Sequence, residues 1–361
     1  MAPAASTRDI TGKDTTPETS RSSFATIADM SERDLVARIQ RRLPPAPPWM
    51  LLGIGDDAAV IEPERNRAEV LSVDALVEGV HFDTSFVPPD AIGHRALAVN
   101  LSDLAAMGAT PRLALLSLVL PAALAVDAFD AMVGGLLRLA SAHATHVAGG
   151  NLTRSPGPLL LDITVAGHVK RRQAMTRGGA RPGDEIYVSG TVGSAGAGLQ
   201  MLEAASPLAV SDAAGPCVRR YLYPEPRVRL GMLLSRNRAA SACIDLSDGL
   251  SDGLYRLAEA SGVGMAIDPR ALPIEPAARA WFAARGIHPV AASLAAGDDY
   301  ELLFTVRPRT GRRLAAAIRH GGTALTRIGV CTADRAMVLK GAPGEPGGDQ
   351  ELPRVGYGHF Q

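Results

Sequence analysis

The chain has 361 residues, of which 47% are hydrophobic and 20% charged, so its length and apolar content allow two domains with sizeable cores. Lys plus Arg and Asp plus Glu each total 37, which gives a formal net charge of zero. This balance excludes a generally basic nucleic-acid-binding protein and an acidic disordered chain. The three cysteines are far apart and form no disulfide framework or zinc-ligand spacing, which favours a reducing compartment.

The N-terminal segment predicts neither secretion nor membrane insertion. Residues 1–29 are rich in Ser, Thr, Pro and Asp and lack the apolar region of a signal peptide, so they are predicted to form a disordered leader. The most apolar stretch, 113–126, contains Pro121 and is too short to span a membrane. We therefore expect a cytoplasmic protein that binds neither membrane nor nucleic acid.

Predicted strands and helices alternate through the first half of the chain. Ser31 followed by Asp34 is typical of a capping box and predicts a helix over 32–42, after which a proline-rich linker follows. Apolar spacing then predicts four strands and two intervening helices, at 58–61, 70–73, 113–120 and 159–169 for the strands and 89–106 and 128–143 for the helices. The first predicted domain covers residues 30–169 and is mixed α/β.

A basic, glycine-containing stretch at 170–182 is the predicted joint between the domains. Beyond it, strands are predicted at 185–189, 265–267 and 300–306, and helices from 195 onward, over 227–236 and over 250–261. The second domain, residues 170–361, is therefore expected to be α/β (α+β) as well.

Aspartates gather beside glycines and at the ends of predicted strands. The residues concerned are Asp56, Asp57, Asp74, Asp103, Asp245 and Asp248. Any one of them could be a helix cap or a turn residue. Together they form a set of carboxylates with no matching Lys or Arg nearby in sequence, and buried carboxylates are costly unless they are paired or bind a metal. Mg²⁺ held by carboxylates and substrate phosphates is the commonest solution.

The glycines indicate phosphate binding of an unusual kind. Three glycine pairs, at 53 and 55, 149 and 150, and 178 and 179, follow or join predicted strands and would leave backbone N–H groups free to approach phosphate. The sequence contains no P-loop motif, no dinucleotide-binding fingerprint in strand-to-helix context, no protein-kinase signature, no nucleophile elbow and no HExxH. A bound nucleotide would therefore be held by a different scheme.

A series of separated motifs resembles those of bacterial thiamine-monophosphate kinases. They are Leu-Gly-Ile-Gly-Asp-Asp-Ala-Ala at 52–59, Ser-Val-Asp at 72–74 leading to Gly-Val-His-Phe at 79–82, Asn-Leu-Ser-Asp-Leu-Ala-Ala-Met-Gly-Ala at 100–109, Arg-Gly-Gly-Ala-Arg-Pro-Gly-Asp at 177–184, Ile-Asp-Leu-Ser-Asp-Gly-Leu at 244–250, Gly-Asp-Asp-Tyr-Glu-Leu at 297–302 and Gly-Tyr-Gly-His-Phe at 356–360. The match runs from about residue 30 to residue 360 in the order of that family.

The resemblance implies transfer of the γ-phosphoryl group of ATP to thiamine monophosphate, which yields thiamine diphosphate in the last step of its biosynthesis. It implies the two-domain fold of the aminoimidazole-ribotide-synthetase superfamily, with N-terminal sheets that pair across a homodimer. It also implies several Mg²⁺ ions, held by Asp57, Ser72, Val73, Asp74, Asp103, Asn151, Asp245 and Asp248. ATP would be contacted by Gly150, Asn151, Arg177 and Ser247, and thiamine monophosphate by His81, Asp298 and Phe360.

Three positions depart from the pattern of the family. Asn151 stands where Asp is frequent and brings no charge, Val73 stands where Thr is common, and Asp298 is one methylene shorter than the usual Glu. The acceptor of the family reaction is already an ionised phosphate, so we expect no general base and no phosphoenzyme. Charge would be stabilised by the metals and by Arg177.

Related enzymes of the superfamily and a silent protein are the alternatives. A selenophosphate synthetase would need a reactive cysteine near the N-terminus, but no cysteine precedes Cys217. The hydrogenase-maturation carbamoyl-dehydratase should end in cysteine, whereas this chain ends at Gln361. An aminoimidazole-ribotide-synthetase-like enzyme and a catalytically silent nucleotide-binding regulator stay open, and only Asn151 favours the second.

Overall fold

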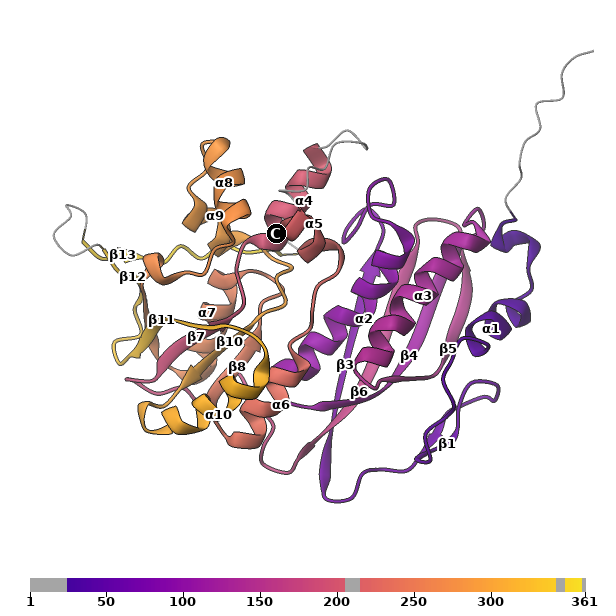
Figure 1. The fold of residues 1–361 in the computed structure, drawn as a ribbon, viewed down its shortest axis with the longest axis horizontal. Coiled ribbons are helices and arrows are strands. Elements are labelled where there is room, and N and C mark those ends of the chain that lie inside the picture. The colour runs from indigo at the N-terminus through magenta and orange to yellow at the C-terminus, as the bar shows by residue number, and fades with distance from the viewer. Residues whose placement is uncertain (1–24, 205–214, 342–347, 359–361) are drawn as a thin grey trace, which may run out of the picture.

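The protein folds around two separate sheets. The computed structural model describes residues 25–204, 215–341 and 348–358. A four-stranded sheet with the order β3-β6-β4-β5 belongs to the first half of the chain, and a seven-stranded sheet with the order β13-β12-β9-β11-β7-β10-β8 belongs to the second (Figure 1). Helices and strands mix in both halves, which confirms the predicted α/β class.

The N-terminal half alternates strands and helices much as predicted. Its elements are η1 (Ile27–Asp29), α1 (Glu32–Gln40), β1 (Met50–Leu52), β2 (Val60–Ile61), β3 (Arg67–Val77), α2 (Pro89–Ala106), β4 (Thr110–Pro121), α3 (Val126–Ala142), β5 (His146–Ser155) and β6 (Leu160–Lys170). Helix α1 begins where the capping box predicts, because the Ser31 hydroxyl accepts a hydrogen bond from the Asp34 N–H at 3.2 Å.

Helices α2 and α3 cover one face of the four-stranded sheet (Figure 1). They approach closely at two glycines: a Cβ on Gly93 would lie 1.8 Å from the Met132 carbonyl oxygen, and one on Gly135 would lie 1.9 Å from that of Asp90. Helix α2 also packs against helix α6 of the C-terminal half, so it is buried on nearly every side. It therefore lies at the boundary between the two domains.

The C-terminal half contains the larger sheet with helices around it. Its elements are β7 (Glu185–Ser189), α4 (Ser194–Ala204), α5 (Gly215–Leu222), α6 (Val228–Asn237), β8 (Ala240–Asp245), α7 (Leu250–Ser261), β9 (Gly264–Ile267), η3 (Pro269–Ala271), α8 (Pro276–Ala284), α9 (Pro289–Ala295), β10 (Leu302–Val306), η4 (Pro308–Thr310), α10 (Gly311–Gly321), β11 (Leu325–Thr332), β12 (Met337–Leu339) and β13 (Gln350–Glu351). Across the described segments, no helix has both the length and the apolarity needed to cross a bilayer.

Two predictions need correction. The leader was predicted to extend to residue 29, but Thr26 forms a β-bridge with Ala125 and the Ile27 side chain is buried in the core. Residues 149–151 were predicted to join strands, yet they lie inside β5, paired in parallel with β4. The pairing of β4 with β5 shifts register just before this segment. Gly150 is needed inside the strand, because its φ is +156° and a Cβ there would lie 1.9 Å from the Leu116 carbonyl oxygen.

Candidate active site

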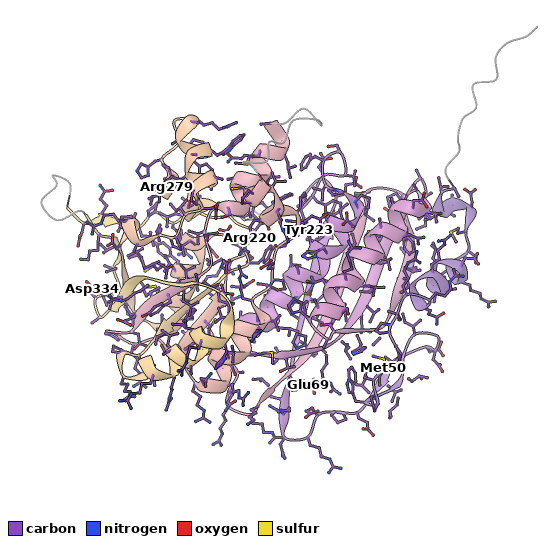
Figure 2. All side chains as sticks on the ribbon, viewed as in Figure 1. Met50, Glu69, Arg220, Tyr223, Arg279 and Asp334 are labelled. Atoms are coloured by element: carbon purple, nitrogen blue, oxygen red, sulfur yellow. The ribbon has the colours of Figure 1, made fainter. Side chains whose placement is uncertain are left out.

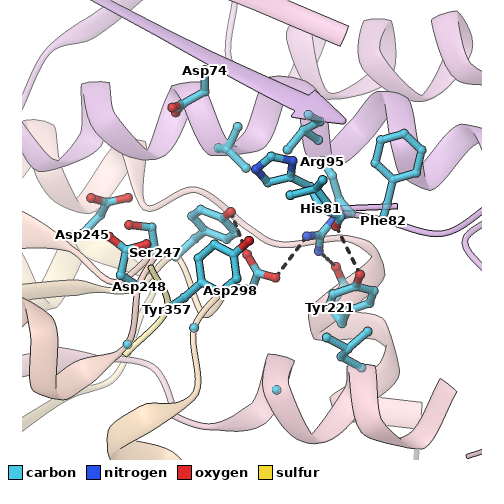
Figure 3. A pocket seen from close by; sticks show the side chains of 18 of the residues that line it. Asp74, His81, Phe82, Arg95, Tyr221, Asp245, Ser247, Asp248, Asp298 and Tyr357 are labelled. Atoms are coloured by element: carbon cyan, nitrogen blue, oxygen red, sulfur yellow. Dashed lines mark hydrogen bonds and ion pairs between the residues drawn. The ribbon is translucent and has the colours of Figure 1, made fainter. Parts of the chain in front are cut away.

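An elongated pocket of about 660 Å³ lies between the two domains. The N-terminal half contributes β3, the segment after it and α2, and the C-terminal half contributes the segments after β8 and before β10 (Figure 3). Eight of the predicted site residues line this pocket: Asp74, His81, Asp103, Arg177, Asp245, Ser247, Asp248 and Asp298. The fold therefore brings together motifs from both halves of the chain.

One stripe of α2 runs the length of the pocket. Arg95, Val99 and Asp103 all line it, and their spacing of four residues places them on the same face of the helix. At about 1.5 Å of rise per residue, Arg95 and Asp103 lie about 12 Å apart along the helix axis. The pocket thus has a carboxylate end at Asp103 and an opposite end at Arg95, which we call the Arg95 end.

Mutually repelling carboxylates form the first end; Asp245 is buried, and Asp74 and Asp103 are partly buried. Burial, and next the charge of Asp103, raise the pKa of Asp74 and that of Asp245 each to about 7. Burial also raises the pKa of Asp103, although a hydrogen bond from Ser72 and the charge of Arg177 oppose this. The Ser72 hydroxyl donates to Asp103, and the Ser102 hydroxyl donates to Asp245 at 2.7 Å.

The chemistry of this end suits a hard cation. In the described part of the chain, no three His, Cys, Asp or Glu side chains converge closely enough to hold a metal ion by themselves. Mg²⁺ commonly takes one or two carboxylates and completes its coordination with water and substrate phosphates. A set of partly buried oxygen ligands that repel one another therefore fits Mg²⁺ accompanied by phosphate.

Two of the remaining predicted residues of this pocket, Asp248 and His81, are held by hydrogen bonds. Asp248 accepts from Arg256 at 3.0 Å, and Arg256 also pairs with Asp252 one helical turn away. The Nδ1 atom of His81 accepts from the Val77 N–H at 3.0 Å, so a neutral ring carries its proton on Nε2. Both residues are thus oriented by their neighbours.

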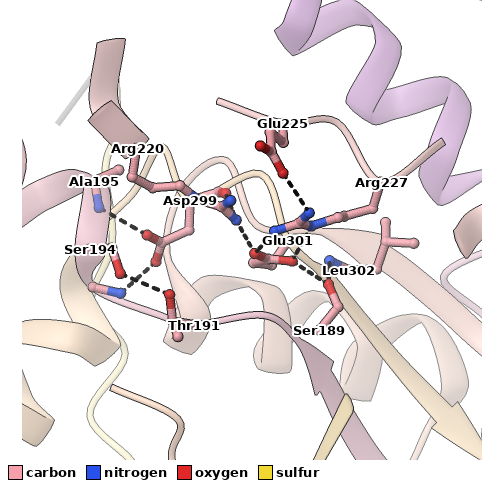
Figure 4. A network of polar contacts seen from close by, with 11 residues as sticks. Ser189, Thr191, Ser194, Ala195, Arg220, Glu225, Arg227, Asp299, Glu301 and Leu302 are labelled. Atoms are coloured by element: carbon pink, nitrogen blue, oxygen red, sulfur yellow. Dashed lines mark hydrogen bonds and ion pairs between the residues drawn. The ribbon is translucent and has the colours of Figure 1, made fainter. Parts of the chain in front are cut away.

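The Gly-Asp-Asp-Tyr-Glu motif directs its side chains alternately to two sides. Asp298 and Tyr300 line the pocket, whereas Asp299 and Glu301 are buried on the other side, among α4, α5 and the segment before α6 (Figure 4). Asp299 accepts from the N–H groups of Gly193 and Ala195 at 2.6 and 3.1 Å. The Arg220 side chain of this network comes from α5 of the C-terminal half (Figure 2).

Glu301 is the centre of the buried network. It is 0% exposed, accepts two hydrogen bonds from Arg227 at 2.7 and 2.6 Å, and also accepts from Arg220 and Ser189. Removing one partner of a buried ion pair leaves the other charge uncompensated. The network therefore fixes the backbone on which Asp298 and Tyr300 stand.

We expect Glu301→Gln to lower the free energy of unfolding by about 3–5 kcal/mol, because two buried guanidinium groups lose their counter-charge. Urea titration followed by circular dichroism measures this. Glu225→Gln is the matched control: Glu225 pairs with Arg227 at 3.1 Å but its side chain is 66% exposed, so the loss should be about 0–1 kcal/mol. Equal effects of the two substitutions would contradict the assignment.

Three predicted site residues lie elsewhere in the chain. Asp57, Gly150 and Asn151 line a second pocket, of about 560 Å³, between α1 and β5. In the sheet register Asp74 is level with Gly150, but β6 and β4 lie between their strands. Three strand spacings of about 4.8 Å place the two positions about 14 Å apart. Within one chain the two sets of predicted ligands are therefore separate.

Three further predicted residues are not in either set. Ser72 contacts the first set through its hydrogen bond to Asp103. Val73 points its side chain away from Asp74 and is 57% exposed. Phe360 lies outside the described residues, whereas Tyr357 of the same motif lines the first pocket. Arg95, Tyr221 and Tyr300 also line it and were not predicted. Arg95 could have been noticed in the sequence because it is a charged residue directly before the apolar residues 96–99.

Comparison with known proteins shows the family to which this fold belongs. Residues 55–169 match the model of the AIR synthase related protein, N-terminal domain, and residues 181–341 match that of the corresponding C-terminal domain. Thiamine-monophosphate kinase of Escherichia coli K12 is 39% identical over 91% of this chain and 98% of its own length. The chain belongs to the thiamine-monophosphate kinase family. The kinase of Bacillus subtilis 168 is 37% identical over 86% of this chain and 94% of its own.

Solved structures of this family share the fold. Thiamine-monophosphate kinase from Stenotrophomonas maltophilia K279a is 38% identical and superimposes with a TM-score of 0.73 over 83% of this chain and 92% of its own. AaThiL complexed with AMPPCP and TMP is 31% identical, with a TM-score of 0.72 over 85% and 92% of the two chains. The hydrogenase maturation protein HypE of E. coli, at 22% identity and a TM-score of 0.70, shares the fold alone. The predicted family and two-domain fold are thus confirmed.

Proposed function

We propose that this chain is a thiamine-monophosphate kinase, which transfers the γ-phosphoryl group of ATP to thiamine monophosphate and releases thiamine diphosphate and ADP. The observation that carries the proposal is the partly buried cluster of Asp74, Asp103 and Asp245 at one end of an elongated interdomain pocket. The relatives that share this family name, and AaThiL with AMPPCP and TMP bound, support the same pair of substrates.

Two polyanions must meet at the carboxylate end, so neutralising charge is the main demand on the site. Asp74, Asp103 and Asp245, with Asp248 and the Ser72 hydroxyl, would hold Mg²⁺, which when bound offsets the charge of the phosphates. Arg177 lines the same end and supplies a fixed positive charge toward the phosphates, and Ser247 supplies a hydroxyl. These are the ATP contacts that we propose for this pocket.

No general base is needed in the proposed reaction. The acceptor oxygen of thiamine monophosphate is already ionised, so it attacks the γ-phosphorus while the bond to the ADP oxygen breaks. His81 and Asp298 lie toward the Arg95 end of the pocket and are proposed to contact the organic part of the acceptor. Tyr357 offers an aromatic ring at the same pocket, where Phe360 was the predicted one.

An acceptor comparison tests the proposal. Purified protein with ATP and Mg²⁺ should convert thiamine monophosphate to the diphosphate, and unphosphorylated thiamine should give no product above background. ATP turnover that yields no thiamine diphosphate would favour another enzyme of the superfamily. ATP binding without any turnover would favour the silent regulator.

We also propose that the protein acts as a homodimer through the open face of the N-terminal sheet. This face, opposite α2 and α3, exposes Leu71 (70%), Val73 (57%) and Leu115 (37%). Exposed apolar rows of this kind mark interaction surfaces. The edge strands β3 and β5 each have one unpaired edge among the described strands, and a second copy of the sheet would cover both.

A second copy would also complete the ligand set. Asp74 lies on β3 at one edge of the sheet, and Asp57 and Asn151 lie at the opposite edge, formed by β5. Pairing β3 of one copy with β5 of the other would therefore bring the two edges together. Each active site would then combine Asp74, Asp103 and Asp245 of one subunit with Asp57, Gly150 and Asn151 of its partner. We propose this shared arrangement for the remaining predicted ligands.

Leu71→Glu should convert a dimer into monomers, because it places a charge in the centre of the proposed interface. Sedimentation equilibrium should give twice the chain mass of 37.6 kDa for the wild type and the single mass for the variant. Ile318→Glu is the control, since Ile318 is 45% exposed on α10 in the other domain. A monomeric wild type, or a dimeric Leu71→Glu variant, would contradict the proposed interface.

A cytoplasmic site of action is the compartment that we propose. ATP is the phosphoryl donor in this proposal, and the three cysteines are free and buried. Burial raises the pKa of the Cys217 thiol to about 11, which keeps it protonated and unreactive.

A further inference from the structure

Arg95 is a buried charge for which the proposed phosphoryl transfer has no direct use. It lies on α2 with only 1% of its surface exposed, about 12 Å along the helix from Asp103. Arginine is almost never buried without partners. The phosphates belong to the carboxylate end, so Arg95 stands where the non-phosphate part of an acceptor must lie.

The contacts of Arg95 cross from the N-terminal to the C-terminal domain. One terminal nitrogen donates to the backbone carbonyl of Tyr221, and the other donates to Asp298 Oδ2 at 3.2 Å (Figure 3). The guanidinium carbon lies 4.1 Å from the centre of the Tyr221 ring. The Nε–H has no hydrogen-bond partner among the described residues. Arg95 therefore supports two residues of the pocket wall and has a donor left over.

Asp298 is held from two directions. Its Oδ2 binds Arg95, and its Oδ1 accepts from the Tyr300 hydroxyl at 2.9 Å. Its backbone is left-handed, with φ +65°, and its N–H donates to the Ser247 carbonyl at 2.7 Å. The side chain keeps 32% exposure, so the carboxylate faces the pocket in one fixed orientation.

We propose that Arg95 is a positioning residue that sets the affinity for the phosphate acceptor and leaves that for ATP unchanged. It fixes the Asp298 carboxylate and the Tyr221 ring as the wall against which the organic part of the acceptor packs. This inference rests on the proposed function, since it takes thiamine monophosphate as the acceptor. The shorter side chain of Asp298 is compatible with it, because Arg95 and Tyr300 reach the carboxylate from both sides.

A purely structural role for Arg95 makes a different prediction. An ion pair that only joins the two domains would, when removed, lower stability and impair both substrates together. A positioning role raises the Michaelis constant for the acceptor and spares that for ATP. The ratio of the two Michaelis constants therefore separates the two roles.

The test compares Arg95→Met, Arg95→Lys and Asp298→Asn by steady-state kinetics in which ATP and thiamine monophosphate are varied separately. Arg95→Met and Asp298→Asn should each raise the Michaelis constant for thiamine monophosphate at least about tenfold, with that for ATP within about twofold. Arg95→Lys keeps the charge but has one nitrogen in place of the two that reach Tyr221 and Asp298, so it should recover only part of the loss. The double variant Arg95→Met with Asp298→Asn should raise the Michaelis constant for thiamine monophosphate no further than the more affected single variant does, because the two residues act as one unit.

Arg112→Met is the matched control. Arg112 is also buried, donates to the Glu62 carbonyl at 2.7 Å and lies 4.2 Å from the Trp49 ring, but it lines neither pocket. It should leave the ratio of the two Michaelis constants unchanged. An unchanged acceptor constant in Arg95→Met, or a parallel rise for ATP, would overturn the inference. If Arg95→Met does not fold, the same criteria apply to Arg95→Lys and Asp298→Asn.

Calorimetric titration with thiamine monophosphate, without ATP, distinguishes this inference from the proposed function. A wild type that binds the acceptor but does not phosphorylate it would refute the kinase. In that case, weaker binding by Arg95→Met and not by Arg112→Met would still support the positioning role. A wild type that does not bind thiamine monophosphate would overturn both.

Discussion

Asp74→Asn should lower turnover by roughly 10²–10³-fold while the protein stays folded. Asp74 is partly buried and lies close to the charges of Asp103, Asp245 and Asp248, so the substitution removes one of the carboxylates that would offset the phosphate charge. It also removes repulsion among like charges, so the free energy of unfolding should be unchanged or slightly higher. Turnover of thiamine monophosphate and urea titration measure the two quantities.

Asp127→Asn is the control for this substitution. Asp127 lies in the first turn of α3, away from both pockets, so its loss should leave turnover near the wild-type level. Near-normal turnover in Asp74→Asn would mean that the cluster does not serve the reaction. Loss of folding in that variant would be a different failure, which the urea titration would reveal.

Subunit mixing should produce the second large effect. If each site combines Asp74 of one subunit with Asp57 of the other, Asp57→Asn and Asp74→Asn homodimers are both inactive. A heterodimer with one variant subunit of each kind has one site free of both substitutions, so it should regain about half of the wild-type activity. Two different affinity tags allow the heterodimer to be purified and assayed alone.

The reciprocal heterodimer makes the test decisive. A subunit with both substitutions, paired with a wild-type subunit, should be inactive in the shared arrangement, because each site then receives one altered residue. If both aspartates of a site came from one chain, the double-variant heterodimer would keep half the activity and the first heterodimer would be inactive. That pattern would overturn the shared site.

Motifs predicted which carboxylates gather in one pocket, whereas the Mg²⁺ chemistry assigned to them stays a prediction. Oxygen ligands beside glycines indicated phosphate and Mg²⁺, and the fold places Asp74, Asp103 and Asp245 together as that pattern requires. Amphipathic or capped elements such as α1 were also predicted correctly, since their signals are local. The resemblance to a family supplied the individual roles, which composition alone could not.

Long-range features were not predictable in the same way. The glycines at 149 and 150 were predicted to follow or join strands, but Gly150 lies inside β5, where the close approach of β4 admits no side chain. The distance of three strands between Asp74 and Asn151 could not be predicted either, because the order of strands in a sheet depends on contacts between segments far apart in the sequence. Arg95 resembles an ordinary helix residue until its partners in the other domain are known.

Direct transfer between the two substrates is the central claim, and ATP labelled in its γ-phosphorus tests it most directly. Incubated with purified protein, Mg²⁺ and thiamine monophosphate, the label should appear in thiamine diphosphate in equal amount to the ADP formed, with none retained on the protein. Label that stays on the protein, or that is released only as inorganic phosphate without thiamine diphosphate, would contradict the account.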